Sequence, residues 1–367
     1  MAEHDFGLLV GAHDATVDKV DPRGELIARE AKARGLQPIL AGRSRARLEP
    51  LARELGFEFR VFALDDARAA AQALASIPSL RVVLLCAGPF VDTSATMIEA
   101  CLQAKVHYLD ITGEISVFEH AFAQHTRAQQ QGVVLCPGVG FDVIPTDCVA
   151  AALKAALPDA IELSLGFDTP QVLSPGTLKS TLDGMGQGGF VRRDGQLQRV
   201  PLAAITRTID FGRGRKLAMA VPWGDVSTAF HSTGIPNVTV YFPTDRATIM
   251  GARLVNHLGF LLRSPVWRKL VDKAVRLLHR GPDEQTRADS PSYVWGEVLN
   301  AKGERRTALL QTANGYSLTV TGALAVVDHL LDGMPGSPAS GGTYTPSRLI
   351  GADLVTRLPN GGQIHIQ

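Results

Sequence analysis

The chain has 367 residues, more than the roughly 100–200 of a usual single domain, so two domains are expected. Apolar residues make up 45% and charged residues 20%, a balance that allows a sizeable buried core. Because 37 basic residues face 36 acidic ones, the formal net charge of +1 excludes a general attraction to nucleic acid or to an anionic membrane.

The first part of the chain alternates short apolar runs with stretches of helical periodicity. Strands are predicted at 6–11, 38–42, 59–63, 82–86, 107–110 and 133–136, and helices at 24–35, 45–55, 67–75, 94–104 and 117–131. This strict alternation predicts an α/β domain of the Rossmann type, with a doubly wound parallel sheet.

The second part of the chain has longer and less regular segments. A helix at 148–157 is followed by predicted strands at 161–167, 217–221, 237–242, 293–299 and 307–312, which indicate an α+β domain with a largely antiparallel sheet. We therefore expect a nucleotide-binding domain at 1–147 and a substrate and dimerisation domain at 148–340. A C-terminal segment at 341–367, with a short element pair near 349–358, is expected to pack back on the first domain.

Residues 250–280 contain two amphipathic helical stretches that are rich in arginine and lysine. A solvated face that covers a domain or homodimer interface is favoured over peripheral contact with a membrane or a lipid-like substrate. No apolar run approaches the roughly 20 residues that a transmembrane helix needs.

The cysteines do not indicate a metal or a disulfide. None belongs to a CxxC pair or to a zinc-ligand spacing with histidine, so buried reduced thiols are expected at Cys86, Cys101, Cys136 and Cys148. The polar residues before the first strand lack the pattern of a signal peptide. The protein is therefore expected to be cytoplasmic.

The first turn of the predicted nucleotide-binding domain is unusual. A pyrophosphate needs glycines between the first strand and the first helix, where backbone amides approach the anion. Gly11, Ala12 and Gly24 flank this turn as candidate cofactor-binding residues. The segment between the two glycines is long, contains no glycine, and carries Asp14, Asp18 and Asp21.

The end of the second strand favours NADP(H) over NAD(H). An NAD site usually has an acidic residue there for the ribose hydroxyl, whereas this chain has Gly42, Arg43, Ser44 and Arg45. Two arginines and a serine suit a 2′-phosphate. The alternative is a solvated helix start without a ligand.

The loops after the later strands supply the other candidates. Small residues that would admit the cofactor follow the fourth strand at Cys86, Ala87, Gly88, Pro89 and Phe90, and further candidate cofactor contacts are Gly113, Gly138 and Gly140. Tyr108 and Asp142 are candidate catalytic residues that could orient a substrate or deliver a proton. Asp110 and Glu114 could do the same or cap the following helix, and Asp147 is expected to be a helix N-cap.

One histidine of the second domain is a further catalytic candidate. His231 lies in a segment, 230–234, that we expect to form a loop between strands together with 223–225. Acid–base catalysis and a purely structural role both remain open for it. The absence of GxSxG, HExxH and P-loop motifs argues against a hydrolase or an NTPase.

Several of these segments together resemble those of a known family. Cys86–Phe90, His107–Glu114 and Pro137–Asp147 look like signature segments of saccharopine dehydrogenase-like oxidoreductases, which include trans-acting enoyl reductases. The similarity continues in Val221–Asp225, His231–Asn237 and Trp295–Val298.

The resemblance implies NADP(H), a Rossmann domain and an α/β substrate domain. It also implies hydride transfer to or from a C=C, C=O or C=N bond of a small or lipid-like substrate. Relatives usually have a compact GATGxTG-type turn, whereas Gly11 and Gly24 are thirteen positions apart. The alternative function is therefore a non-catalytic binding or scaffold relative whose nucleotide site is impaired by the enlarged turn.

Overall fold

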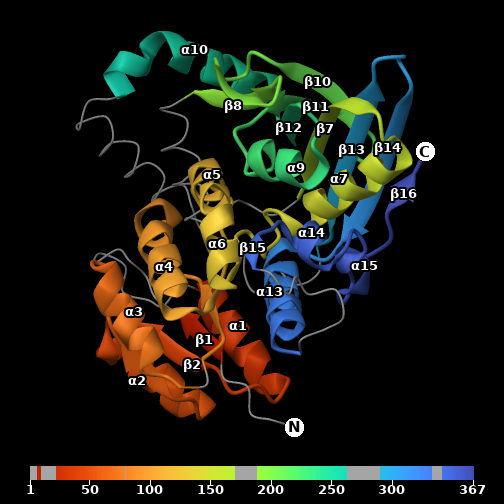
Figure 1. The fold of residues 1–367 in the computed structure, drawn as a ribbon. Helices are drawn as coiled ribbons and strands as arrows, with labels where there is room; N and C mark the ends of the chain where they lie inside the picture. The colour runs from red at the N-terminus through yellow and green to blue at the C-terminus, as the bar shows by residue number, and fades with distance from the viewer. Residues whose placement is uncertain (1–5, 10–21, 79, 170–187, 263–289, 333–340) are drawn as a thin grey trace. The chain divides into compact units, whose positions relative to one another are not determined.

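The computed structural model describes residues 6–9, 22–78, 80–169, 188–262, 290–332 and 341–367 (Figure 1). The chain divides into two compact units. Unit 1 consists of Met1–Ile144 and Gly315–Pro359, and unit 2 of Pro145–Asn314 and Asn360–Gln367. Gly11, Ala12 and the segment between Gly11 and Pro22 lie outside the described residues.

Unit 1 is built on a parallel sheet. Its strands, in the order β15, β6, β5, β4, β1, β2, β3, are Gly342–Thr343, Val134–Cys136, His107–Asp110, Val82–Leu85, Phe6–Leu9, Ile39–Gly42 and Phe59–Val61. Every neighbouring pair is parallel. The order reverses between β1 and β4, so the predicted doubly wound sheet is confirmed.

The helices of unit 1 follow the strands as predicted, with two differences. They are α1 Pro22–Ala33, α2 Arg45–Leu55, α3 Ala67–Ala75, α4 Phe90–Ala104, α5 Ile115–Ala123 and α6 His125–Gln131. The predicted helix at 94–104 begins earlier, at Phe90, because Glu114 supplies a cap from a distant loop. The predicted helix at 117–131 is two helices, since the backbone of Gln124 leaves the helical conformation (φ −88°, ψ 1°).

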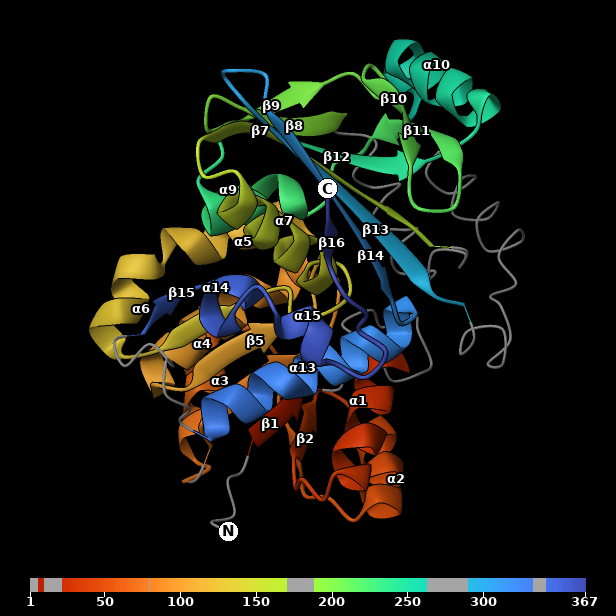
Figure 2. The ribbon, with the colours of Figure 1, turned by 90° about the vertical axis from the view of Figure 1, so that its right-hand side faces the viewer.

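The end of the chain returns to unit 1. Helix α13, Gly315–Leu331, contacts α1 (Figure 2), and the guanidinium of Arg81 donates to the Leu331 carbonyl at 2.8 Å. Strand β15 extends the sheet beside β6, and the short helices α14, Pro346–Ile350, and α15, Leu354–Arg357, follow. The expected second domain at 148–340 was therefore wrong to include α13, whose apolar residues are buried in unit 1.

Unit 2 contains a mixed sheet that is mostly antiparallel, as predicted. Its main path runs β10, β11, β12, β7, β13, β14, β16, and β8 pairs with β12 and β9. Only the β12–β7 pair is parallel. The strands are β7 Ala160–Asp168, β8 Gly189–Arg193, β9 Gln196–Val200, β10 Thr206–Asp210, β11 Arg215–Ala220, β12 Asn237–Pro243, β13 Ser292–Asn300, β14 Arg305–Thr312 and β16 His365–Ile366.

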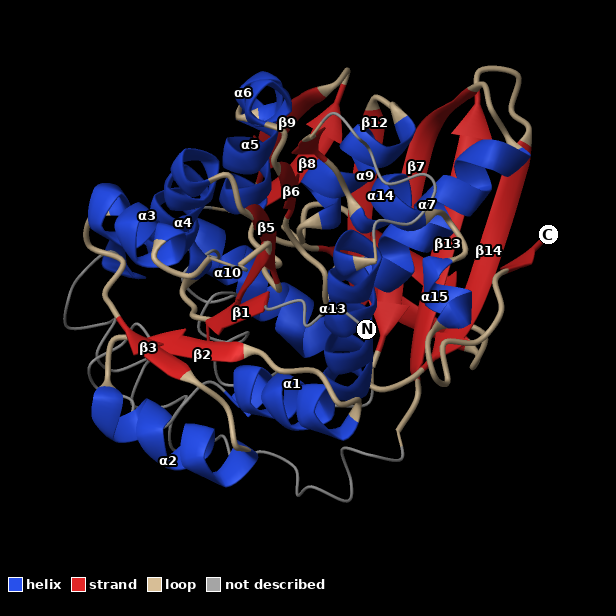
Figure 3. Ribbon diagram, turned by 60° about the horizontal axis from the view of Figure 1, so that its bottom comes forward, coloured by secondary structure: helices blue, strands red, loops and turns tan. Residues whose placement is uncertain are grey.

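Helices cover one face of this sheet, and α10, Arg246–Leu262, follows β12. On the covered face lie α7, Ile144–Ala156, and α9, Asp225–Thr233 (Figure 3). A Cβ placed on Gly296 of β13 would lie 2.6 Å from Val149 of α7, so this glycine lets α7 approach the sheet. The opposite face carries a buried aromatic cluster that includes Phe211 and Trp295.

Within the described residues, no helix is both long enough and apolar enough to cross a bilayer. The same residues contain no cluster of three or more His, Cys, Asp or Glu side chains arranged to hold a metal ion. All four cysteines are buried and free of disulfides, as the sequence predicted.

A substitution of Gly341 tests how closely the chain before β15 packs against its neighbours. Its φ is +66°, and a Cβ there would lie 2.6 Å from the Ala128 carbonyl oxygen and 2.7 Å from the Val133 nitrogen. We expect Gly341→Ala to lower the free energy of unfolding by about 3 kcal/mol, because backbone must move. Gly56, at φ +74° with open space around it, is the matched control, and Gly56→Ala should cost only about 1 kcal/mol. Equal losses in urea unfolding would contradict the steric argument.

Candidate dinucleotide site

Four loops of unit 1 meet at one edge of the parallel sheet. Because neighbouring strands are parallel, the residues after β2, β4, β5 and β6 all leave the sheet at its carboxyl edge. The loops begin at Arg43, Cys86, Ile111 and Pro137. Open α/β sheets bind ligands at this edge, near the point where the strand order reverses.

The loop after β2 is cationic. Arg43 and Arg45 are exposed, and no carboxylate stands between Gly42 and Leu48. Ser44 is the N-cap residue of α2, but its hydroxyl makes no capping hydrogen bond. The arginine charges and the positive end of α2 therefore point to an anion at this place, as a 2′-phosphate requires.

The loop after β4 is made of small and buried residues. Cys86 and Ala87 are buried, and the Gly88–Pro89 peptide bond is cis. The Thr93 hydroxyl donates to the Ala87 carbonyl at 2.7 Å and fixes the loop against α4. A Cβ on Gly88 would make ordinary van der Waals contact with the Phe90 ring at 3.6 Å, so the neighbours within the protein do not require glycine at this position.

Glu114, from the loop after β5, caps α4. Its carboxylate accepts hydrogen bonds from the backbone amides of Val91 at 2.9 Å and Phe90 at 3.3 Å. Of the two alternatives for Glu114, a side-chain cap of the following helix is wrong, because Glu114 is the N-cap residue of α5 but its carboxylate makes no capping bond to α5. Burial raises the pKa of Glu114, and these amide bonds oppose the rise. Because Glu114 already uses these amides, α4 is a poor place for a cofactor phosphate.

Asp110 is fully buried at the end of β5. One carboxylate oxygen accepts from the amides of Thr112 at 2.9 Å and Gly138 at 2.8 Å, and the other accepts from the Tyr108 hydroxyl at 2.6 Å. Burial raises the pKa of Asp110 to about 6, although all three hydrogen bonds favour the ionised form. The carboxylate therefore joins the loops after β5 and β6 and does not cap a helix.

The loop after β6 is held tightly. Gly138 has φ +77°, and a Cβ there would lie 2.7 Å from Val143 and 2.8 Å from Phe118. At Gly140, a Cβ would lie 3.2 Å from Thr319 of α13, whose hydroxyl accepts from the Phe141 amide at 3.1 Å. Only glycine fits the first position without displacing its neighbours.

Asp142 lies beside the loop after β5. A Cβ on Gly113 would be 3.1 Å from an Asp142 carboxylate oxygen, which fixes how close the two loops come. The Asp142 side chain is half-buried, and desolvation raises its pKa while the charge of Arg23 lowers it. Arg23, in the first turn of α1, therefore supplies a positive charge close enough to Asp142 to lower its pKa.

The predicted catalytic residues do not form one group. Tyr108 is fully buried and engaged with Asp110, whereas Asp142 lies at the loop edge of the same unit. His231 belongs to unit 2, where the predicted loop at 230–234 is wrong because 225–233 form α9. Asp147 lies inside α7 and accepts from the Ser232 hydroxyl, so the predicted N-cap was also wrong.

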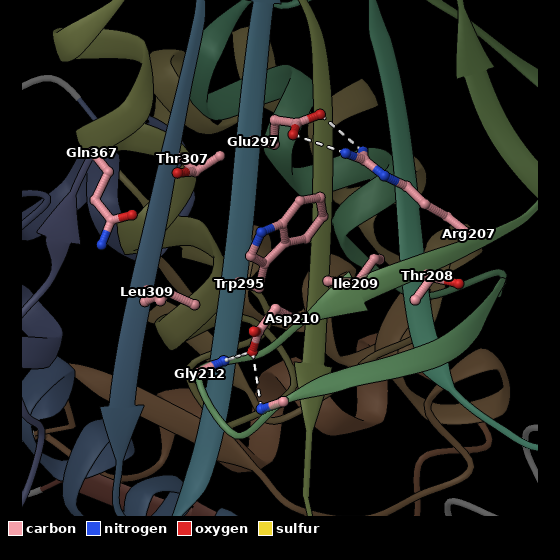
Figure 4. A pocket seen from close by; sticks show the side chains of 11 residues that line it. Arg207, Thr208, Ile209, Asp210, Gly212, Trp295, Glu297, Thr307, Leu309 and Gln367 are labelled. Carbon is pink, nitrogen blue, oxygen red and sulfur yellow. Dashed lines mark hydrogen bonds and ion pairs between the residues drawn. The ribbon is translucent and has the colours of Figure 1, made fainter.

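Unit 2 has a groove of about 370 Å³ on the sheet face opposite α7 (Figure 4). Trp295 and Leu309 form its floor as a cross-strand pair of β13 and β14. At one end Arg207 makes two 2.8 Å bonds to the Glu297 carboxylate, and at the other Asp210 accepts from the amides of Gly212 and Gly214. Arg207 and Glu297 pair with each other and Asp210 binds backbone amides, so these three charged groups already have partners within the protein.

Comparison with known proteins finds a match for part of unit 1. Residues 24–136 match the sequence model of the saccharopine dehydrogenase NADP binding domain. A saccharopine dehydrogenase-like oxidoreductase of Mus musculus is 31% identical over 120 residues, which are 31% of this chain and 28% of that protein. A probable mitochondrial saccharopine dehydrogenase-like oxidoreductase of Arabidopsis thaliana is 28% identical over 113 residues, 29% of this chain and 25% of that protein. The matched stretch spans less than a third of either relative.

A solved structure shares the fold over nearly the whole chain. The apo saccharopine dehydrogenase (L-Glu forming) of Saccharomyces cerevisiae aligns with a TM-score of 0.60 and covers 99% of both chains. The identity is only 10%, so this likeness concerns the fold alone. The fold class and the NADP(H) cofactor predicted from the sequence are confirmed.

Glu114 provides the first test of the site's construction. In Glu114→Ala the two amides of α4 lose their acceptor, and we expect the free energy of unfolding to fall by about 1–3 kcal/mol. Glu114→Gln keeps an acceptor oxygen and should recover part of this loss. Glu58→Ala removes an exposed carboxylate and should change stability by less than about 0.5 kcal/mol. If urea unfolding shows that Glu114→Ala lowers the free energy of unfolding no more than Glu58→Ala does, the Glu114 cap does not stabilise α4.

Proposed function

We propose that the protein is an NADP(H)-dependent oxidoreductase, because residues 24–136 of unit 1 match the saccharopine dehydrogenase NADP binding domain. Its reaction would be hydride transfer to or from a C=C, C=O or C=N bond. The proposed substrate is a small or lipid-like molecule.

The cationic end of β2 is the observation that carries this proposal. Arg43 and Arg45 lie within the matched residues 24–136 and both are exposed; Arg45 makes a long ion pair with Glu49 at 3.9 Å, one turn further along α2. An acidic side chain at this place would accept the ribose hydroxyl of NAD(H), whereas two guanidinium groups favour the extra phosphate of NADP(H). The residues present therefore fit the adenosine half of NADP(H).

The side of the sheet that carries the loops after β4, β5 and β6 fits the nicotinamide half of the cofactor. Dinucleotides lie across the carboxyl edge with one half on each side of the switch point, which assigns the loops after β4, β5 and β6 to the nicotinamide side. Gly88 carries no side chain that would obstruct a ligand there, and Gly113 and Gly138 let the neighbouring loops pack closely. When bound, the cofactor supplies or accepts the hydride, and the protein orients the partners.

Asp142 is the proposed proton-handling residue. Its carboxylate is half-buried at the loop edge, and desolvation raises its pKa, so it can hold a proton nearer to neutral pH than an exposed aspartate can. Tyr108 is a weaker candidate, because its hydroxyl donates to Asp110. His231 stays a catalytic hypothesis for unit 2.

A non-catalytic binding protein is the second candidate. The sequence between Gly11 and Gly24 favours it, because three aspartates without a glycine stand where a pyrophosphate is normally bound. Homodimer formation and a cytoplasmic location remain predictions. The relative from Arabidopsis thaliana is named as a probable mitochondrial protein, and that location is stated for the relative alone.

The decisive experiment is a calorimetric titration of the purified protein with NADPH and NADH. Replacing Arg43 and Arg45 together by alanine should weaken NADPH binding at least about tenfold, since charge-assisted bonds to a phosphate are lost. Binding of NADH should change less than about twofold. Arg53→Ala, which removes an exposed arginine at the other end of α2, is the matched control and should alter neither affinity.

Two outcomes would change the assignment. Equal losses for NADPH and NADH in the double variant would remove the 2′-phosphate role of these arginines. If the wild-type protein binds neither dinucleotide, the non-catalytic candidate replaces the reductase. A thermal-shift experiment is an independent check of dinucleotide binding, because a ligand at 100 times its dissociation constant adds about 2.7 kcal/mol of stability.

A further inference from the structure

We propose that Asp110 and Glu114 are positioning residues that hold the loops after β4, β5 and β6 in one arrangement and thereby set the affinity for the nicotinamide half of NADP(H). The inference rests on the proposed function, because it assumes that the cofactor binds at this edge. Neither residue need touch the cofactor.

The first link joins the loops after β5 and β6. Asp110 accepts the Thr112 amide from its own loop and the Gly138 amide from the next one on the same carboxylate oxygen. Its backbone carbonyl also accepts the Val139 amide at 2.7 Å. A single buried residue therefore fixes where both loops leave the sheet.

The second link joins the loops after β4 and β5. Glu114 binds the first amides of α4, directly after the Gly88–Pro89 turn, and its own amide donates to the Thr112 hydroxyl at 3.1 Å. Between the two acids, a Cβ on Gly113 would lie 3.1 Å from an Asp142 carboxylate oxygen, so the loop after β6 approaches this glycine closely. The five residues from Asp110 to Glu114 thus connect all three loops.

The residues that join these loops have little room to move. Asp110 has no exposed surface, so water cannot replace a lost bond without opening the core. Gly138 is confined between Val143 and Phe118, and its amide therefore cannot follow a displaced carboxylate. When Asp110 gains or loses its charge, we therefore expect the loops after β5 and β6 to change position at the carboxyl edge of the sheet.

The link is expected to weaken in acid. The pKa of Asp110 is raised to about 6, and a neutral carboxyl group accepts amide hydrogen bonds more weakly than a carboxylate does. The titratable groups that face it are Tyr108, whose own pKa is raised so that it stays protonated, and Glu114, whose pKa is raised by burial. Affinity for the nicotinamide half should therefore rise as the pH rises through about 6.

The contribution of Asp110 to protein stability should change with pH in the opposite direction to the affinity and should fall as the pH rises. Because the pKa of Asp110 in the folded protein lies above the value of 3.8 of an unperturbed aspartate, the folded state binds its proton more tightly. The contribution of Asp110 to stability is thus greatest below about 4 and is lost as the pH rises through about 6. If Asp110 had a purely structural role, the affinity for the nicotinamide half would fall together with the stability of the protein as the pH rises. A positioning role predicts that this affinity rises with pH while the contribution of Asp110 to stability falls.

The test compares NADP⁺ with 2′,5′-ADP on the full-length protein from pH 5.5 to 7.5. 2′,5′-ADP contains the adenosine half only and carries a similar phosphate that titrates near pH 6, so it reports pH effects that do not involve the nicotinamide half. We expect the affinity of NADP⁺ relative to 2′,5′-ADP to rise several-fold across this range. A constant ratio would overturn the inference.

Variants locate the effect on Asp110. Asp110→Asn keeps the size and one acceptor oxygen, and it should lower the relative affinity for NADP⁺ about tenfold at pH 7.5 and flatten its pH dependence. Tyr108→Phe removes the hydrogen bond that lowers the pKa of Asp110, so the midpoint should move to higher pH. Asp225→Asn changes a buried carboxylate of unit 2 that accepts the Thr146 hydroxyl, and it should leave the ratio unchanged.

The outcomes separate this inference from the function on which it rests. If the wild-type protein binds neither NADP⁺ nor 2′,5′-ADP, the proposed function fails. If it binds both and the Asp110→Asn and Tyr108→Phe variants keep the wild-type ratio and midpoint, the function stands and the positioning role is overturned. Should Asp110→Asn not fold, Tyr108→Phe and Glu114→Gln decide, the latter by a lower relative affinity for NADP⁺ at pH 7.5.

Discussion

The structure of unit 1 depends on a buried carboxylate at the centre of its ligand edge. Placing Asp110 in the core carries a large desolvation cost, which is tolerated only because hydrogen-bond donors surround it. Those donors come from β5 and from the loops after β5 and β6, so satisfying the charge also aligns the two loops. The same contacts that make the burial tolerable therefore shape the edge where a ligand would bind.

The two halves of this edge differ in their electrostatics. Beside β2 the charges are the exposed guanidinium groups of Arg43 and Arg45, whereas the acids Asp110, Glu114 and Asp142 stand after β5 and β6. Phosphate groups are attracted to the first half and repelled by the second. A nicotinamide ring tolerates the acidic half far better than a phosphate does, so the charge distribution favours one orientation of the dinucleotide over the reverse.

The sequence predicted regular elements well where the periodicity is local. β5 at His107–Asp110 and α3 at Ala67–Ala75 have the predicted bounds. Helix α13 was missed because it is apolar on most of its surface and lacks the one-sided pattern of an exposed helix. For the site, residue types and the NADP(H) cofactor could be predicted, but the contact of Glu114 with Val91, 23 positions away in the chain, could not. Local patterns carry no information about such partners.

The match to the NADP binding domain ends at residue 136, directly before the loop after β6. The buried link from Asp110 lies inside the matched range, but the amide that it holds belongs to Gly138 and the half-buried acid at the edge is Asp142, both outside it. The carboxyl edge of the sheet is therefore built from residues on both sides of this limit. Because Asp110 holds the Gly138 amide, a residue inside the matched range fixes where the loop outside it leaves the sheet.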